Sequence, residues 1–259
     1  MKSTLRQIQS QLIYDNRSFW RNPAAAFFTF AFPLIFLVVF TSMFGNDMIT
    51  TPSGMSASGS TFYIPAIITL SVINSTYTGL AMQVTVLRDS GFLKRVYGTP
   101  LPVWLFLASK IIHLTFVGVI LILIVSLFGS LFYGVTLPST TAASAICSII
   151  LGLFTFSSLG LAITTVIPNA NAAPAIVNAS VIPLLFVSDV FIPLENAPDW
   201  MVYISAIFPV QHLARMLLSA FDPFAAGSGF ELDHLAIVGI WGVAGLIIAI
   251  KRFSWEPRI

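Results

Sequence analysis

The chain has 259 residues, of which 57% are hydrophobic and only 8% are charged, and its mean hydropathy is +0.92. Soluble domains carry roughly 25% charged residues, so this composition excludes a soluble globular protein and indicates a polytopic membrane protein. The single cysteine, Cys147, excludes an internal disulfide, and a net charge of +2 makes the placement of the charges more informative than their sum.

Residues 1–22 are predicted to form a basic amphipathic helix. Apolar side chains recur there at helical spacings, and basic side chains fall between them. A helix of this kind lies in the headgroup region of a membrane. It serves either as a plain anchor or as an element that transmits motion. The side chains expected to hold it at the interface are Arg6, Arg17, Trp20 and Arg21.

Six apolar segments are long enough to cross a bilayer, which takes about 20 residues. They cover residues 24–44, 62–87, 111–135, 142–167, 172–192 and 235–250, with Pro or Gly marking the breaks. Two shorter apolar stretches, 201–208 and 213–221, are split by Pro209 and predict an extracytoplasmic helical hairpin between spans five and six. The predicted fold class is therefore an all-α polytopic membrane protein with six transmembrane helices, in a single domain over residues 1–259.

The basic residues predict how these spans are oriented. Lys and Arg of short loops stay in the cytoplasm. All of the 12 basic residues except Arg215 lie in the N-terminal segment, the loop after the second span or the C-terminal tail. Since those segments fall on one side of a six-span protein, both termini are predicted to be cytoplasmic.

No motif in the sequence assigns an enzymatic reaction. The histidines, His113, His212 and His234, are dispersed and lack the spacing of metal ligands. Neither a GxSxG nucleophile elbow nor a GxxxxGK[ST] phosphate loop occurs, and no basic surface suits a nucleic acid. We therefore predict no catalytic residue, no metal ligand and no nucleic-acid partner.

Uncharged polar residues interrupt the second and fifth spans. Such residues commonly bond neighbouring helices, and alternatively they line a path for an amphipathic substrate. The spans lack a charge near the midplane, which disfavours a proton- or sodium-coupled carrier. The candidate pathway residues are Asn74, Tyr77, Thr78, Gln83, Asn178, Ser188 and Asp189.

Residues 88–104, RDSGFLKRVYGTPLPVW, gather charge between two apolar spans. Phe92 and Leu93 offer an apolar face, and Lys94 and Arg95 offer a basic one. The Gly and Pro residues that follow end any helix. The segment is either a short, rigid helix that a partner can grip or a positively charged loop with snorkelling side chains.

Two stretches carry a resemblance to a known family. GFLKRVYGTPLPVWLFLASKI, residues 91–111, resembles the cytoplasmic loop of ABC type-2 transporter permeases, where a Thr-Pro step follows a coupling helix with a basic pair. PLLFVSDVFIPLENAPDWMVYISAIFPVQHL, residues 183–213, is similar to the family's exit signature. Asp189 departs from that signature, which more often has a small residue there. The branch that the chain resembles is the drug- and antibiotic-export, daunorubicin-type branch.

This resemblance implies a multidrug-efflux or antibiotic-export permease of the cell (inner) membrane that carries hydrophobic or amphipathic molecules. It implies a homodimer, or a pair with a paralogue, and two P-loop ATPase subunits that bind ATP and Mg²⁺, whereas this chain binds no cofactor. The residues expected to contact the ATPase are Arg88, Asp89, Phe92, Leu93, Lys94 and Arg95. Two alternatives stay open, namely export of a lipid-linked glycan and a non-transporting membrane scaffold or sensor subunit.

Overall fold

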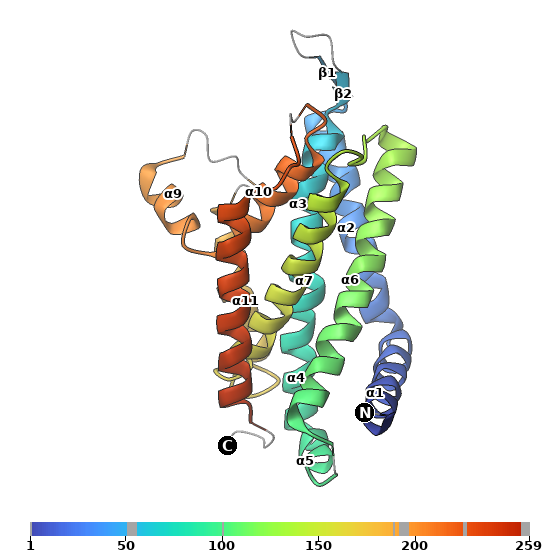
Figure 1. The fold of residues 1–259 in the computed structure, drawn as a ribbon, viewed down its shortest axis with the longest axis vertical. Helices are drawn as coiled ribbons and strands as arrows, with labels where there is room; N and C mark the ends of the chain where they lie inside the picture. Colours follow the sequence, from blue (N-terminus) through green and yellow to red (C-terminus); the bar gives the residue numbers. More distant parts are fainter. Residues whose placement is uncertain are drawn as a thin grey trace.

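The computed structural model describes residues 2–50, 56–99, 101–188, 190–191, 197–224 and 227–254, and these form a bundle of helices (Figure 1). Two helices, α1 (Lys2–Trp20) and α5 (Phe92–Tyr97), lie at the same end of the bundle as the last turn of α11 (Leu232–Arg252). At the other end lie α10 (Pro209–Phe221) and a short β-hairpin.

Five described helical segments are long and apolar enough to cross a membrane. They are α2 (Pro23–Phe44), the continuous run of α3 (Ser60–Val72), η1 (Ile73–Thr78) and α4 (Gly79–Asp89), α6 (Val103–Tyr133), α7 (Ala142–Ile163) and α11. The pair of α9 (Asp199–Ser205) and α10 is bent by 90° and makes a sixth crossing if it is one span. The chain therefore has five or six candidate spans.

The predicted spans 24–44, 62–87, 142–167 and 235–250 each coincide with one of these helices. The helix for span 111–135 begins earlier, at Val103, because Pro102 is extended and the apolar side chains that follow it are buried in the bundle.

The predicted fifth span, 172–192, corresponds to α8 (Ala173–Phe186), which has 14 residues and is shorter than the length of about 20 that spans a bilayer. The two short helices of the predicted hairpin are present as α9 and α10, and Pro209 opens α10. Their placement on the extracytoplasmic side stays a prediction. The all-α prediction missed the β-hairpin, in which β1 (Met48–Thr50) pairs antiparallel with β2 (Ser56–Ser58).

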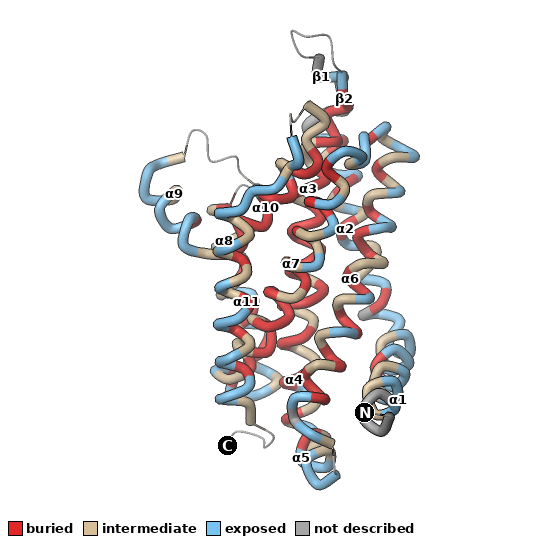
Figure 2. Tube along the Cα trace, in the orientation of Figure 1, coloured by how far each residue is buried: buried red, intermediate tan, exposed pale blue. Residues whose placement is uncertain are grey.

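Buried residues concentrate on α3, η1, α7 and α10, whereas α1, α5 and α9 are mostly exposed (Figure 2). Small residues allow α7 to lie close to its neighbours, as is usual between membrane helices. A Cβ added at Gly242 of α11 would lie 2.6 Å from Oγ1 of Thr155, and one added at Gly160 would lie 2.8 Å from the carbonyl oxygen of Tyr77. The contact at Gly160 is with the backbone of η1.

The segment η1 is a six-residue π-helix inside an otherwise α-helical span. Insertions of this kind in α-helices occur frequently at functional sites. The apolar pattern predicts a helix through these residues but does not distinguish the π-helical turn from an α-helix. Because η1 packs against α7 and α6, it lies in the centre of the bundle.

Candidate functional site

The short helix α5 lies where the sequence predicted one. Gly91, with φ at +69°, turns the chain out of α4 and into α5. Leu93 is 0% exposed and packs among the apolar side chains of α4 and α6. Phe92 stacks on Tyr14 of α1, with ring centroids 6.0 Å apart. These contacts fix α5 against the bundle and against α1.

The basic pair of α5 faces away from those contacts. Lys94 and Arg95 are both exposed, whereas Leu93, which directly precedes them, is buried. A six-residue helix with a buried apolar side and an exposed basic side is suited to contact an acidic partner surface.

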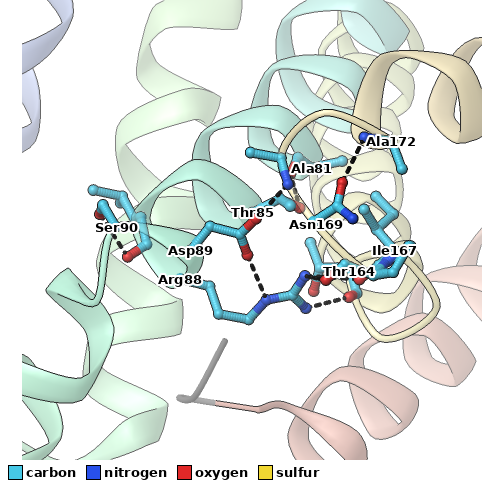
Figure 3. Close-up of polar contacts among 12 residues, drawn as sticks. Ala81, Thr85, Arg88, Asp89, Ser90, Thr164, Ile167, Asn169 and Ala172 are labelled. Atoms are coloured by element: carbon cyan, nitrogen blue, oxygen red, sulfur yellow. Dashed lines mark hydrogen bonds and ion pairs between the residues drawn. The ribbon is translucent and has the colours of Figure 1, made fainter. Parts of the chain in front are cut away.

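Arg88, in the last turn of α4, points into the bundle instead. Its side chain is 3% exposed, and its guanidinium donates to the carbonyl oxygens of Thr164 at 2.9 Å, Ile167 at 2.7 Å and Pro168 at 3.2 Å (Figure 3). Asp89 accepts a hydrogen bond from the backbone amide of Ala170 (Figure 3). The two adjacent residues therefore bind the turn between α7 and α8.

The Arg88 guanidinium supplies hydrogen bonds to carbonyl groups at and beyond the end of α7. The last carbonyl groups of a helix have no partner within it, and a cation is favourable beside them. Arg88 supplies that cation just beyond the end of α7. Sequence analysis placed Arg88 and Asp89 among the contacts to an ATPase; in the single chain both side chains are engaged with the 164–170 turn.

A buried ion pair joins α1 to α6. Nζ of Lys110 lies 2.6 Å from Oδ1 of Asp15, and the two side chains are 2% and 0% exposed. This pair was not predicted from the sequence, although one signal for it was present. Asp15 follows Leu12 by three residues and precedes Phe19 by four, so it lies on the apolar face of an amphipathic helix.

The expected interfacial residues of α1 lie on its outer side. Arg6, Arg17, Trp20 and Arg21 are all exposed. The indole Nε1 of Trp20 donates to Oδ1 of Asn16 at 3.1 Å, and its ring stacks on Phe30 of α2. An exposed row of basic and aromatic side chains fits an interfacial helix, and that location stays a prediction.

The candidate pathway residues do not share one surface. Tyr77 is buried, and its hydroxyl lies 2.7 Å from Oγ of Ser180 on α8, so it joins η1 to that helix. Ser188 is buried and donates to the carbonyl of Leu185 at 3.3 Å. Asn178 on α8 is exposed.

The remaining candidates differ again in their surroundings. Asn74, Thr78 and Gln83 are half-buried, and Oε1 of Gln83 is buried without a hydrogen-bond partner. Asp189 lies outside the described residues. Packing between helices therefore explains Tyr77, whereas it does not explain the exposed amide of Asn178.

The structure corrects the prediction that the histidines are dispersed. His212 and His234 are 22 residues apart in the chain, yet their Nδ1 atoms lie 2.7 Å apart because α10 packs against α11. The Nε2 atom of His212 lies 2.8 Å from the carbonyl oxygen of Ala206. Among the described residues, no group of three or more His, Cys, Asp or Glu side chains could hold a metal ion.

These features define a class of protein: a multi-pass helical membrane protein with a short helix and an amphipathic helix at one end. Residues 6–221 match the ABC-2 type transporter family, and the chain belongs to that family. It is a permease subunit, the non-catalytic transmembrane part of such a transporter, and ATP binding lies in a partner ATPase.

The relatives of the chain are distant but extend over most of its length. A protein named as a transport permease, ycf38 of Cyanophora paradoxa, is 25% identical and covers 79% of this chain and 71% of its own. YvfS of Bacillus subtilis, which is also named as a transport permease, is 23% identical, with 79% of this chain and 81% of its own covered. The daunorubicin resistance ABC transporter permease protein DrrB1 of Streptomyces coeruleorubidus is 26% identical, with 85% and 71% covered.

The family confirms the coarse part of the resemblance seen in the sequence. Transport permeases predominate among these names, which favours transport over the scaffold or sensor alternative. Only one of the three names states a drug, and its 26% identity to this chain is within a few per cent of the identities of the other two. Membership of the family therefore leaves the substrate and the branch to be proposed.

Proposed function

We propose that this chain is the membrane path of an exporter for hydrophobic or amphipathic small molecules, and that α5 is its coupling helix. The observation that carries the proposal is the division of α5 into a buried side at Leu93 and an exposed basic side at Lys94 and Arg95. A helix fixed to the bundle on one side transmits force applied to its other side.

The end of the bundle with α1 and α5 faces the cytoplasm in this proposal. The basic residues of the N-terminal segment, of the 88–110 loop and of the C-terminal tail support that orientation. Two P-loop ATPase subunits then dock there and bind ATP with Mg²⁺. Of the six residues expected at this contact, Lys94 and Arg95 touch the ATPase directly, with Phe92 and Leu93 behind them.

The path itself forms between two copies of the permease, or between this chain and a paralogue. Asn178 supports α8 as a lining element, because an exposed amide on an apolar helix is expensive in hydrocarbon and favoured beside a polar partner or water. Spans that lack a charge near the midplane suit a drug-like or antibiotic-like molecule better than an ion. A lipid-linked glycan is the alternative substrate, as 23 Phe residues could supply aromatic rings to a wide path.

The test is purification of the tagged chain from detergent-solubilised membranes, followed by an ATPase assay. We expect a P-loop ATPase to co-purify with the parent chain and to be lost or weakened with Lys94→Glu and with Arg95→Glu. The matched control is Arg215→Glu, which makes the same charge reversal on α10 at the far end of the bundle.

Two results would overturn the proposal in different parts. Recovery of the parent chain without any ATPase, at several detergent strengths, would remove the proposed motor. Undiminished co-purification with both α5 variants would move the docking site away from α5. For the substrate, inverted vesicles incubated with a hydrophobic fluorescent drug should accumulate the drug when ATP is supplied. Accumulation of a lipid-linked glycan instead would favour the alternative.

A further inference from the structure

Two neighbouring charges at the end of α4 hold both sides of the turn between α7 and α8. Arg88 binds the carbonyl oxygens at positions 164, 167 and 168, and Asp89 accepts from the amide of Ala170, three residues before α8 begins. Nε of Arg88 also lies 3.6 Å from Oδ1 of Asp89, so the two neighbouring side chains form an ion pair.

The chemistry of a guanidinium makes this a rigid attachment. Its donors lie in one plane in a fixed fork, and less freedom is lost per hydrogen bond than with a flexible ammonium. Bonds from a charged donor are about twice as strong as those between neutral groups. Three carbonyls on one fork therefore fix the position and the orientation of the turn relative to α4.

No free linker separates this attachment from α5. The amide of Ser90 donates to the carbonyl of Val86, that of Gly91 to Arg88, and that of Arg95 to Gly91. Leu93 of α5 is buried against α4. Backbone hydrogen bonds thus continue from α4 into α5, and a displacement of α5 is expected to carry Arg88 and Asp89 with it.

The helix that follows the turn, α8, packs on α4, and its inner side chains join the main core. Within the described residues, α8 packs chiefly on α4, and the Tyr77 hydroxyl adds a hydrogen bond from η1 to Ser180. The attachment at Arg88 and Asp89 is consequently in a position to set where α8 lies.

We propose that Arg88 and Asp89 are positioning residues that join α5, the end of α4 and the 164–172 turn into one rigid body, so that a displacement of α5 moves α8. This inference rests on the proposed function, in which α5 receives the motion of an ATPase. In this inference the two residues do not touch the ATPase themselves, and α8 is the helix that responds to a displacement of α5.

The test measures distances between spin labels in the full chain, with Cys147→Ser as the background. Labels at Tyr97→Cys on α5 and Val166→Cys on the turn occupy exposed positions on the two sides of the attachment. Leu232→Cys, exposed at the start of α11, supplies a reference at the far end. Samples are the permease in lipid nanodiscs, alone and with its co-purified ATPase, without nucleotide and with a non-hydrolysable ATP analogue.

In the parent chain we expect the 97–166 distance to be narrowly distributed and unchanged by nucleotide, and the 166–232 distance to change with nucleotide. In Arg88→Gln and in Asp89→Asn the 97–166 distribution broadens and the nucleotide response of the 166–232 distance is lost, while the ATPase stays bound. If Arg88→Gln does not fold, Asp89→Asn still tests the inference, because in that variant Arg88 remains as the donor to the carbonyls at 164, 167 and 168. Ser90→Ala is the matched control, since among the described residues the Ser90 hydroxyl donates to the carbonyl of Leu87 in the preceding turn and makes no bond to the 164–172 turn.

Three outcomes overturn the inference. In the first, the 97–166 distance of the parent chain changes with nucleotide. In the second, Arg88→Gln and Asp89→Asn both keep the parent's 97–166 distribution and its nucleotide response. In the third, Arg88→Lys keeps both as well, which would make the forked guanidinium irrelevant. The width of the 97–166 distribution is measured without any ATPase, so the rigid body is tested even if none co-purifies. Failure to bind an ATPase would count against the proposed function alone.

Discussion

The buried pair of Asp15 and Lys110 makes a sharp prediction about stability. Changing Lys110 to Met removes the ammonium and keeps most of the unbranched side chain. It leaves the Asp15 carboxylate without its 2.6 Å partner in a site where it is 0% exposed. Breaking a buried ion pair by removing one partner costs about 3–5 kcal/mol. An exposed pair at the same distance would contribute only about 0.2–1 kcal/mol, so the two cases are well separated.

The full experiment is a double-mutant cycle. We expect Lys110→Met and Asp15→Asn each to destabilise the protein, and the double variant to recover most of the loss, because no uncompensated charge remains. The free energy of unfolding is measured in mixed micelles of mild detergent and dodecyl sulfate. Amide hydrogen exchange of α1 adds a local readout, since a loss of about 3 kcal/mol in the docking of α1 raises its exchange rate roughly a hundredfold.

Arg17→Gln is the matched control, because it removes a charge from the same helix at an exposed position. We expect it to change the free energy of unfolding by about 0.5 kcal/mol or less. The reasoning is refuted if Lys110→Met costs no more than this control, or if the double variant is as unstable as the sum of the two single variants.

Two further predictions concern the centre of the bundle. Gly160→Ala should destabilise the protein by about 1–3 kcal/mol, because the added Cβ would lie 2.8 Å from the Tyr77 carbonyl oxygen. Gly239→Ala is the control, since its Cβ would have open space and should not destabilise the protein. Equal effects of the two variants on the free energy of unfolding would contradict the close packing at η1. Tyr77→Phe should lower the free energy of unfolding by about 0.6 kcal/mol, the usual value for a hydrogen bond between membrane helices, because it loses the 2.7 Å contact with Ser180. A change near zero in the same unfolding assay would show that this hydrogen bond does not hold α8.

The spans and the short helices could be predicted from the sequence for a simple physical reason. A charge-free stretch of about 20 residues has few alternatives to a membrane helix, so α2, the α3–α4 run, α7 and α11 were placed with small errors. A Gly before an apolar and basic hexapeptide left a short helix and a positively charged loop as alternatives, and the family resemblance favoured the helix that the structure has as α5. The family resemblance came from residues 91–111 and 183–213 and agrees with the family match over 6–221.

The contacts that make the candidate site could not be predicted in the same way. Arg88 and Asp89 look like two more charges of a basic loop, and their partners are backbone groups about 80 residues later, which carry no side-chain signal. The π-helical turn of INSTYT has no composition that separates it from an α-helix. The end of α8 at Phe186 was missed because the apolar pattern continues beyond it.

The distance in sequence between Asp15 and Lys110 has a consequence for biosynthesis. The chain positions of the two residues differ by 95, so the carboxylate leaves the ribosome well before its partner exists. At about 5–20 residues per second, that interval lasts roughly 5 to 20 s. Throughout it, Asp15 must remain in contact with water, since an unpaired buried carboxylate is too costly. Docking of α1 is therefore a late event, completed only after α6 is made, although α1 is the first helix to be synthesised.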